Sequence, residues 1–232
     1  MNRALAPLVL LLSLAFALSP AASGGFPGFS PTQFPIVQSR WPVQPVGWAF
    51  SIWGPIFLGL IASAGWGLWR RRTDPQWQAM RLPLTVSLAI GTLWIAVANV
   101  EPLIATVMII FMAAAATEAL LRAPREIAAW GPVGLYAGWV SAAAGVAMGA
   151  VLSGYGVLSP QIAALAILVV LSLVGVAVIW VCPAAPSYLF SLCWAYMGVI
   201  VAGLEPLNAA VVGLSGVAIL KLTALSLVRR PA

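Results

Sequence analysis

The chain has 232 residues, of which 62% are hydrophobic and only 7% are charged, whereas an ordinary soluble domain has about 25% charged residues. This composition excludes a soluble globular protein, because too few polar side chains are present to cover a surface in water. The formal net charge of +6 comes from arginines at the ends of apolar runs, which is typical of membrane proteins and not of a nucleic-acid-binding surface. Without histidine, and with Cys182 and Cys193 standing alone, no metal site is predicted.

Eight apolar runs follow one another along the chain, each close to the 20 or so residues that a helix needs to cross a bilayer core. They cover residues 4–21, 46–69, 83–100, 102–121, 131–153, 161–181, 186–203 and 206–227. Helices are expected, because an open sheet edge cannot lie in lipid and the runs lack the alternation of a barrel strand. The predicted fold class is an all-α integral membrane protein with about eight transmembrane helices. Its predicted partner is the lipid bilayer.

The first run has a second interpretation. Arg3 precedes the apolar stretch, and small residues surround position 22, as in a secretory signal peptide. Residues 1–22 are therefore either the first span or a cleaved signal, and cleavage would leave seven spans in the same orientation.

The arginines predict the orientation, since they collect in short cytoplasmic loops. If the N-terminus with Arg3 is inside, the short loops that carry arginine and the C-terminal tail all lie on that side as well. These arginines are Arg70, Arg71, Arg72, Arg81, Arg122, Arg125, Arg229 and Arg230. Only Arg40, in the long outer segment 22–45, falls on the other side. We expect a multi-pass protein of a bacterial cytoplasmic membrane with both termini in the cytoplasm.

The second run opens with Gln44-Pro-Val-Gly-Trp-Ala-Phe-Ser-Ile-Trp-Gly-Pro-Ile-Phe57. This stretch resembles the TspO/MBR family (translocator protein, tryptophan-rich sensory protein), in which a proline-led segment with Phe and Trp at helical spacing begins the second helix. The residues that match are Pro45, Phe50, Trp53, Ile56 and Phe57, and further along the chain Trp94, Pro132, Leu135, Tyr136 and Trp139.

The resemblance implies a TspO-like five-helix bundle over residues 1–153, followed by an additional three-helix membrane segment over 154–232. Two positions depart from the family pattern: Gly91 stands where the family commonly has asparagine, and Ala147 stands near an asparagine expected in the fifth span. The chain therefore looks like a longer, divergent member.

The resemblance also implies a membrane sensor or translocator that binds a hydrophobic or tetrapyrrole-type ligand between helices, without catalysis and without a resident cofactor. Aromatic faces suit such ligands, because they offer stacking area at little cost in entropy. The candidate ligand-binding residues are Trp48, Phe50, Trp53, Phe57, Trp94, Tyr136 and Trp139. For Trp48, and for Trp41 in the outer segment, an interfacial aromatic belt is the favoured alternative.

Charges within or beside spans are candidates for ion coupling. Glu118 and Lys221 can pair with each other across helices, or Glu118 can pair with Arg122 four residues on while Lys221 reaches the headgroups. Glu101 and Glu205 precede prolines at outer turns, where either ion coupling or placement at a helix N-terminus explains them.

The alternative function is a small secondary transporter that uses Glu101 or Glu205 for ion coupling. A short echo supports it, because residues 99–103 resemble 203–207 and transporters often contain repeats. Gly145 and Gly149 predict a close helix contact, either within the chain or across a homodimer.

Overall fold

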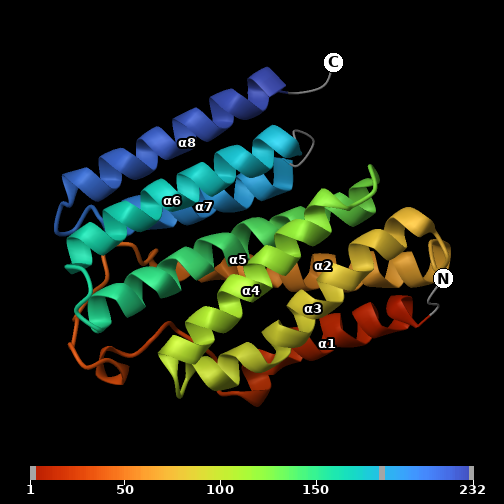
Figure 1. Cartoon of the computed structure of the whole chain (residues 1–232), viewed down its shortest axis with the longest axis horizontal. Coiled ribbons are helices and arrows are strands. Elements are labelled where there is room, and N and C mark those ends of the chain that lie inside the picture. The colour runs from red at the N-terminus through yellow and green to blue at the C-terminus, as the bar shows by residue number, and fades with distance from the viewer. Residues whose placement is uncertain (1–3, 183–185, 230–232) are drawn as a thin grey trace.

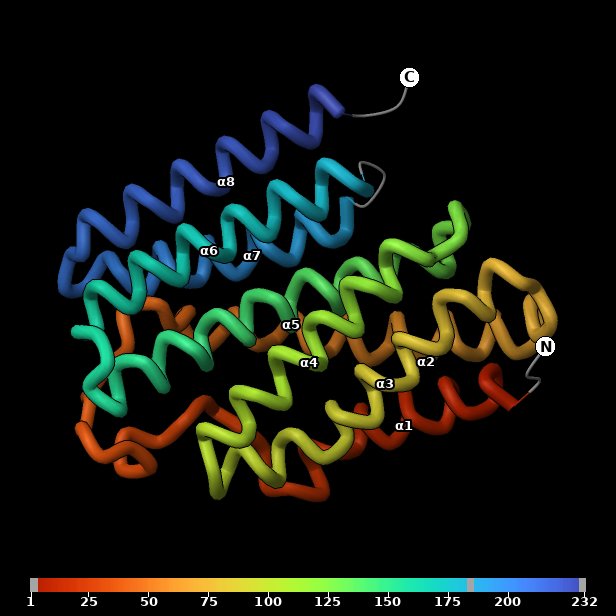
Figure 2. The backbone as a smooth tube through the Cα atoms, in the orientation of Figure 1, coloured from red at the N-terminus to blue at the C-terminus, as the bar shows by residue number. Residues whose placement is uncertain are grey.

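The computed structural model describes residues 4–182 and 186–229; Arg3 and Arg230 lie outside these ranges. Within them the chain forms eight α-helices and two 3-10 helices, and no strand. The elements are α1 (Leu5–Ala22), η1 (Pro31–Gln33), η2 (Gly47–Ile52), α2 (Trp53–Arg70), α3 (Pro75–Ala98), α4 (Pro102–Leu121), α5 (Ile127–Gly154), α6 (Pro160–Val181), α7 (Pro186–Ala202) and α8 (Ala209–Arg229). Successive α-helices run in opposite directions, so α1 begins and α8 ends at the same end of the molecule (Figure 1, Figure 2).

Seven of the described helices are long and apolar enough to cross a membrane, and α7, with 17 residues, is shorter. At 1.5 Å per residue α7 is about 25 Å long, a little less than the roughly 30 Å of a bilayer core. It packs against α5 and α8. The predicted all-α membrane class is confirmed, and the seventh predicted run, 186–203, forms the short helix α7.

The start of α3 differs from the prediction, because the helix begins at Pro75 and not at residue 83. The Asp74 carboxylate accepts the backbone N–H of Gln76 at 2.9 Å, which caps the helix, and proline is favourable at the first helical position. Arg81, expected in the loop, is a buried residue of α3. Its guanidinium donates to the Gly67 carbonyl at 2.7 Å, which explains how a charge lies inside the helical region.

Other boundaries shift by a few residues. The predicted second span begins with the 3-10 helix η2 before α2 starts at Trp53. The two Glu-Pro turns also differ, because Pro102 is the first residue of α4 whereas Pro206 lies before the start of α8 at Ala209. The echo between the two turns is therefore not a shared local structure.

The helices form two groups that share α5 (Figure 1). In the first, α1 packs on α2 and α3, α3 on α4, and both α4 and α2 on α5, which closes a ring of five. In the second, α6 and α7 pack on α5, and α8 packs on both of them. The division of the chain at residue 153 stays a prediction, but α5 belongs to both groups.

Small residues let α5 occupy this central place. A Cβ atom on Gly138 would lie 2.5 Å from the Tyr188 carbonyl oxygen of α7, so the two backbones approach as closely as glycine allows. Gly145 faces Ile167 of α6, and Gly149 faces Val43 of the outer segment. The close contacts of both glycines are therefore within the chain.

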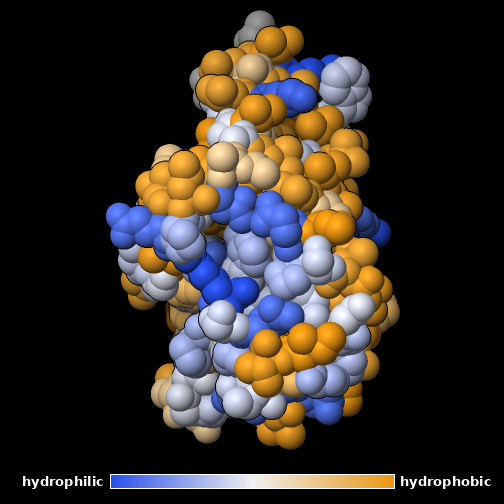
Figure 3. Space-filling model, turned by 90° about the vertical axis from the view of Figure 1, so that its left-hand side faces the viewer, coloured by the Kyte–Doolittle hydropathy of each residue, from blue (hydrophilic) through white to orange (hydrophobic). Residues whose placement is uncertain are grey.

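The segment 23–46 folds over one end of the bundle. Its Gln33 side chain donates to the Ala98 carbonyl at 3.0 Å, the Ile36 N–H to Gly154 at 2.9 Å, and the Val46 N–H to Gly198 at 3.0 Å. Figure 3 views this end, with hydrophilic surface in the middle and hydrophobic surface at its borders. The segment is thus tied to the ends of α3, α5 and α7, and it closes the interior beneath it.

Candidate functional site

An interior cavity lies beneath the 23–46 segment, where the two helical groups meet. The segment and the first group contribute Phe26, Gly28, Phe29, Trp41, Val43, Gln44, Pro45, Phe50, Trp53, Trp94 and Ile109. The remaining walls come from α5, α6 and α7, through Trp139, Ala142, Ala143, Val146, Ala147, Ala150, Ile167, Leu168, Leu171, Ala195, Tyr196 and Val199. The lining is almost wholly apolar, so the cavity suits a hydrophobic ligand.

Aromatic rings of η2, α2 and α5 form one wall of the cavity, and a further pair joins the 23–46 segment to α3. The Trp139 ring meets the Phe50 ring edge to face, with centroids 5.7 Å apart, and the Trp53 ring at 6.2 Å. Phe26 of the outer segment packs edge to face on Trp94, with centroids 4.8 Å apart. Edge-to-face contacts hold each ring in a fixed orientation, so the wall is preorganised.

The cavity is narrow. Its volume is only about 70 Å³, although 23 residues line it. So small a volume along so extended a lining is typical of a thin crevice. The shape therefore favours a flat or slender molecule over a compact one.

Two buried indole N–H groups on this lining lack partners. The Nε1 atoms of Trp41 and Trp139 have no hydrogen-bond acceptor among the described residues, whereas Trp94 donates to the Ala105 carbonyl at 2.8 Å. Buried donors are normally paired. Acceptor oxygens on a ligand would satisfy Trp41 and Trp139.

Comparison with known proteins agrees with this architecture. A family model described as TSPO-like protein matches residues 8–228, nearly the whole chain. The chain belongs to the TSPO-like family. The match runs from α1 into α8, so it extends past the first five spans in which the resemblance was seen. No curated protein and no solved structure matches the chain.

Of the seven predicted ligand-binding residues of this TSPO-like protein, four line the cavity: Phe50, Trp53, Trp94 and Trp139. The structure thus brings together residues that lie up to 89 positions apart in sequence. They come from η2, α2, α3 and α5.

The other three lie outside the lining. Phe57 stacks behind Trp53, with centroids 5.2 Å apart, and Trp48 is exposed and packs edge to face on Trp194. The hydroxyl of the fully buried Tyr136 shares a hydrogen bond of 2.8 Å with Ser87. Phe57 and Tyr136 therefore support the helices that carry the wall.

Several lining residues were not predicted. Trp41 was expected in an interfacial belt, but this was wrong, because its side chain is buried against Phe34 and lines the cavity. Phe26, Phe29 and Tyr196 were also missed. For Phe26 and Phe29 the available signal was the cluster of aromatic residues in a Gly- and Pro-rich segment, because burying these rings favours folding of the segment onto the bundle. No local feature of the sequence distinguishes Tyr196.

The two departures from the family pattern have physical consequences. A Cβ atom on Gly91 would lie 2.9 Å from the Phe16 ring and 3.1 Å from Met112, so Phe16 fills the space that a larger residue would need. Ala147 lines the cavity. Both substitutions leave the interior more apolar than asparagine would.

The candidate ion-coupling residues lie apart from the cavity lining. Glu118 forms an ion pair with Arg122, four residues on, at 2.5 Å; this was one of the two pairings predicted for it. Lys221 is an exposed residue of α8. Glu101 precedes α4 as its N-cap residue, and Glu205 is exposed in the α7–α8 turn. Ion coupling through these residues stays a prediction.

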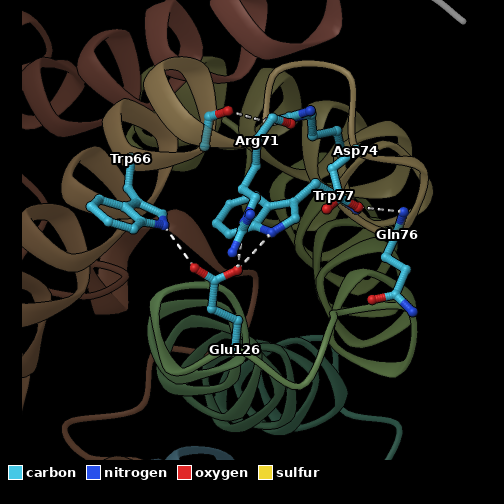
Figure 4. Close-up of polar contacts among 8 residues, drawn as sticks. Trp66, Arg71, Asp74, Gln76, Trp77 and Glu126 are labelled. Atoms are coloured by element: carbon cyan, nitrogen blue, oxygen red, sulfur yellow. Dashed lines mark hydrogen bonds and ion pairs between the residues drawn. The ribbon is translucent and has the colours of Figure 1, made fainter.

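A polar cluster that was not predicted lies at the end of the molecule opposite the 23–46 segment. The Glu126 carboxylate, just before α5, accepts the indole N–H of Trp66 at 2.7 Å and of Trp77 at 3.1 Å, and the Arg71 Nε–H at 3.1 Å (Figure 4). Burial raises the pKa of the Glu126 carboxyl, but these three donors outweigh it, so the pKa lies below its ordinary value. The cluster ties α2 and α3 to the start of α5.

Proposed function

We propose that this TSPO-like protein is a membrane sensor or translocator that binds a flat, hydrophobic, tetrapyrrole-type ligand in the aromatic cavity without transforming it. The observation that carries the proposal is the wall of Phe50, Trp53 and Trp139, whose rings are held edge to face beside a thin crevice. Stacking on such faces binds planar apolar molecules well.

The lining also fits the polar rim of such a ligand. The indole N–H groups of Trp41 and Trp139 are donors without partners among the described residues, and Gln44 adds an amide to the lining. Tetrapyrroles carry carboxylate side groups, which are hydrogen-bond acceptors. The chain thus offers the ligand a stacking surface and N–H donors, and the proposed function requires only that the ligand binds.

The proposal places the cavity in the outer half of a bacterial cytoplasmic membrane. Arg70, Arg71, Arg72, Arg122 and Arg125 lie at the end opposite the 23–46 segment (Figure 1), and arginine-rich short loops stay in the cytoplasm. The ligand then reaches the crevice from the outer side or from the outer leaflet.

Titration of the purified protein in detergent with protoporphyrin IX in the dark tests the proposal. Both tryptophan quenching and the porphyrin absorption band are followed. We expect saturable binding, weakened more than about tenfold in Trp53→Ala, which loses the stacking face, and about fivefold in Trp139→Phe, which keeps a ring but loses the donor.

Trp69→Ala is the matched control, because Trp69 is exposed at the opposite end and contacts Arg70. Its affinity should equal that of the unmodified protein. Non-saturable quenching, or equal affinities in Trp53→Ala and Trp69→Ala, would contradict the proposed site. Progressive loss of the porphyrin band in the dark would contradict binding without transformation.

A further inference from the structure

A second hollow lies on the outside of the bundle, where α4 and α6 both pack on α5 and leave a groove between them. Its floor is made of small residues of α5, including Ser141, Ala144 and Gly145, and its sides include the exposed Ile110 of α4 and Val170 of α6. With the layer next to the walls excluded, the groove holds about 310 Å³. It is therefore wider than the interior cavity and opens toward lipid.

The length of the groove matches one leaflet of a bilayer. Along α4 it runs from Ile110 to Leu121, which at 1.5 Å per residue is about 16 Å. Half of a hydrocarbon core is about 15 Å. The α4 wall of the groove therefore runs from the middle of the helix to its arginine-rich end, whereas the α5 and α6 walls lie near the middle of those helices.

The Arg122 guanidinium lies beside the end of the groove, next to Glu118. Glu118 lines the groove and accepts the Nε–H of Arg122 at 2.5 Å. This contact orients the guanidinium, whose terminal N–H groups have no partner within the described part of the chain. Guanidinium groups bind phosphate through paired hydrogen bonds.

We propose that this groove binds a phospholipid of the arginine-side leaflet, with one acyl chain between α4 and α6 and the phosphate on Arg122. An apolar groove open to hydrocarbon is filled by the chains around it, and the cation at its end selects those that carry a phosphate. The Glu118–Arg122 pair is then a positioning device for the guanidinium and not an ion-coupling site.

Native mass spectrometry of the full-length protein in detergent tests the proposal. The protein is titrated with dioleoyl phosphatidylglycerol and with dioleoylglycerol, which has the same chains but no phosphate. We expect a saturable one-to-one adduct that forms about tenfold more tightly with the phospholipid. Arg122→Gln should abolish this difference, and Ala114→Trp, which fills the groove from its exposed rim, should remove the adduct.

Two variants serve as matched controls. Arg72→Gln removes an exposed arginine of the same end, and Ala96→Trp adds the same bulk on an exposed face of α3; both should bind like the unmodified protein. Adducts that are unchanged in Ala114→Trp would place the lipid elsewhere and overturn the proposal. Equal affinity for the two lipids would refute the role of Arg122. A dimer that disappears in Ala114→Trp would show that a second copy of the chain occupies the groove.

Discussion

Glu126 accepts hydrogen bonds from donors of α2, α3 and the turn between them, which lie 49 to 60 residues earlier in the sequence. Trp66 and Trp77 reach it from α2 and α3, and Arg71 reaches it from the turn between them. Nothing in the local sequence marks this carboxylate, because its partners are chosen by how the helices pack. The role of Glu126 at the arginine-rich end therefore could not be predicted from the sequence pattern.

Replacing this carboxylate should lower stability in a pH-dependent way. We expect Glu126→Gln to reduce the free energy of unfolding by about 1 kcal/mol at neutral pH, because the amide loses the ion pair and one acceptor oxygen. Since the folded-state pKa is depressed, the contribution of Glu126 is present above the ordinary pKa of glutamate and is lost as the pH falls through the folded-state value. Thermal unfolding in detergent from pH 7 to 3 measures it.

Glu118→Gln is the control for this prediction. Its partner Arg122 lies four residues away on an exposed surface, where such pairs contribute at most about 0.5 kcal/mol. Equal destabilisation by the two variants would show that the Glu126 cluster does not hold α2, α3 and α5 together.

At the scale of elements, hydropathy located the spans but not the true ends of the helices. The apolar run predicted from residue 83 is the lipid-length part of α3, whereas the helix continues back to Pro75 because Asp74 caps it and backbone carbonyls receive Arg81. Hydropathy measures what lipid tolerates, and helix ends depend on capping. The predicted span and the actual helix therefore differ wherever a charged side chain, such as Arg81, forms hydrogen bonds inside the protein.

The close approach of the α5 and α7 backbones requires glycine at position 138. In Gly138→Ala the new Cβ would meet the Tyr188 carbonyl oxygen at 2.5 Å, and a backbone atom cannot rotate away. We expect a loss of about 1–3 kcal/mol through forced separation of the helices. Unfolding of the variant in detergent measures this loss.

Gly131→Ala is the matched variant on the same helix, since its nearest new contact is Ile127 at 3.7 Å. It should be neutral or slightly stabilising, because alanine favours helix more than glycine does. If both variants unfold alike, the close approach of α5 and α7 is not what requires glycine at position 138.

At the scale of the whole molecule, alternating helix directions place the α2–α3 and α4–α5 loops at one end and the α3–α4 and α5–α6 turns at the other (Figure 2). Single cysteines at Arg125 and Val157, both exposed, in a chain lacking Cys182 and Cys193 should therefore react from opposite sides of the membrane. A membrane-impermeant maleimide applied to intact cells should label position 157 and spare 125. Labelling of both from outside would contradict the topology.

The sequence alone determined the class and the number of helical segments, because lipid imposes span length and charge asymmetry on the chain itself. The family followed from the motif at residues 44–57. The resemblance to the family also pointed to Phe50, Trp53, Trp94 and Trp139, which line the cavity. The tertiary structure decided that the 23–46 segment folds inward and carries Trp41 to the cavity, and that α6 and α7 supply the remaining walls. Those contacts join residues far apart in the chain, and they depend on which faces of the helices pack, a choice that hydropathy does not record in uniformly apolar helices.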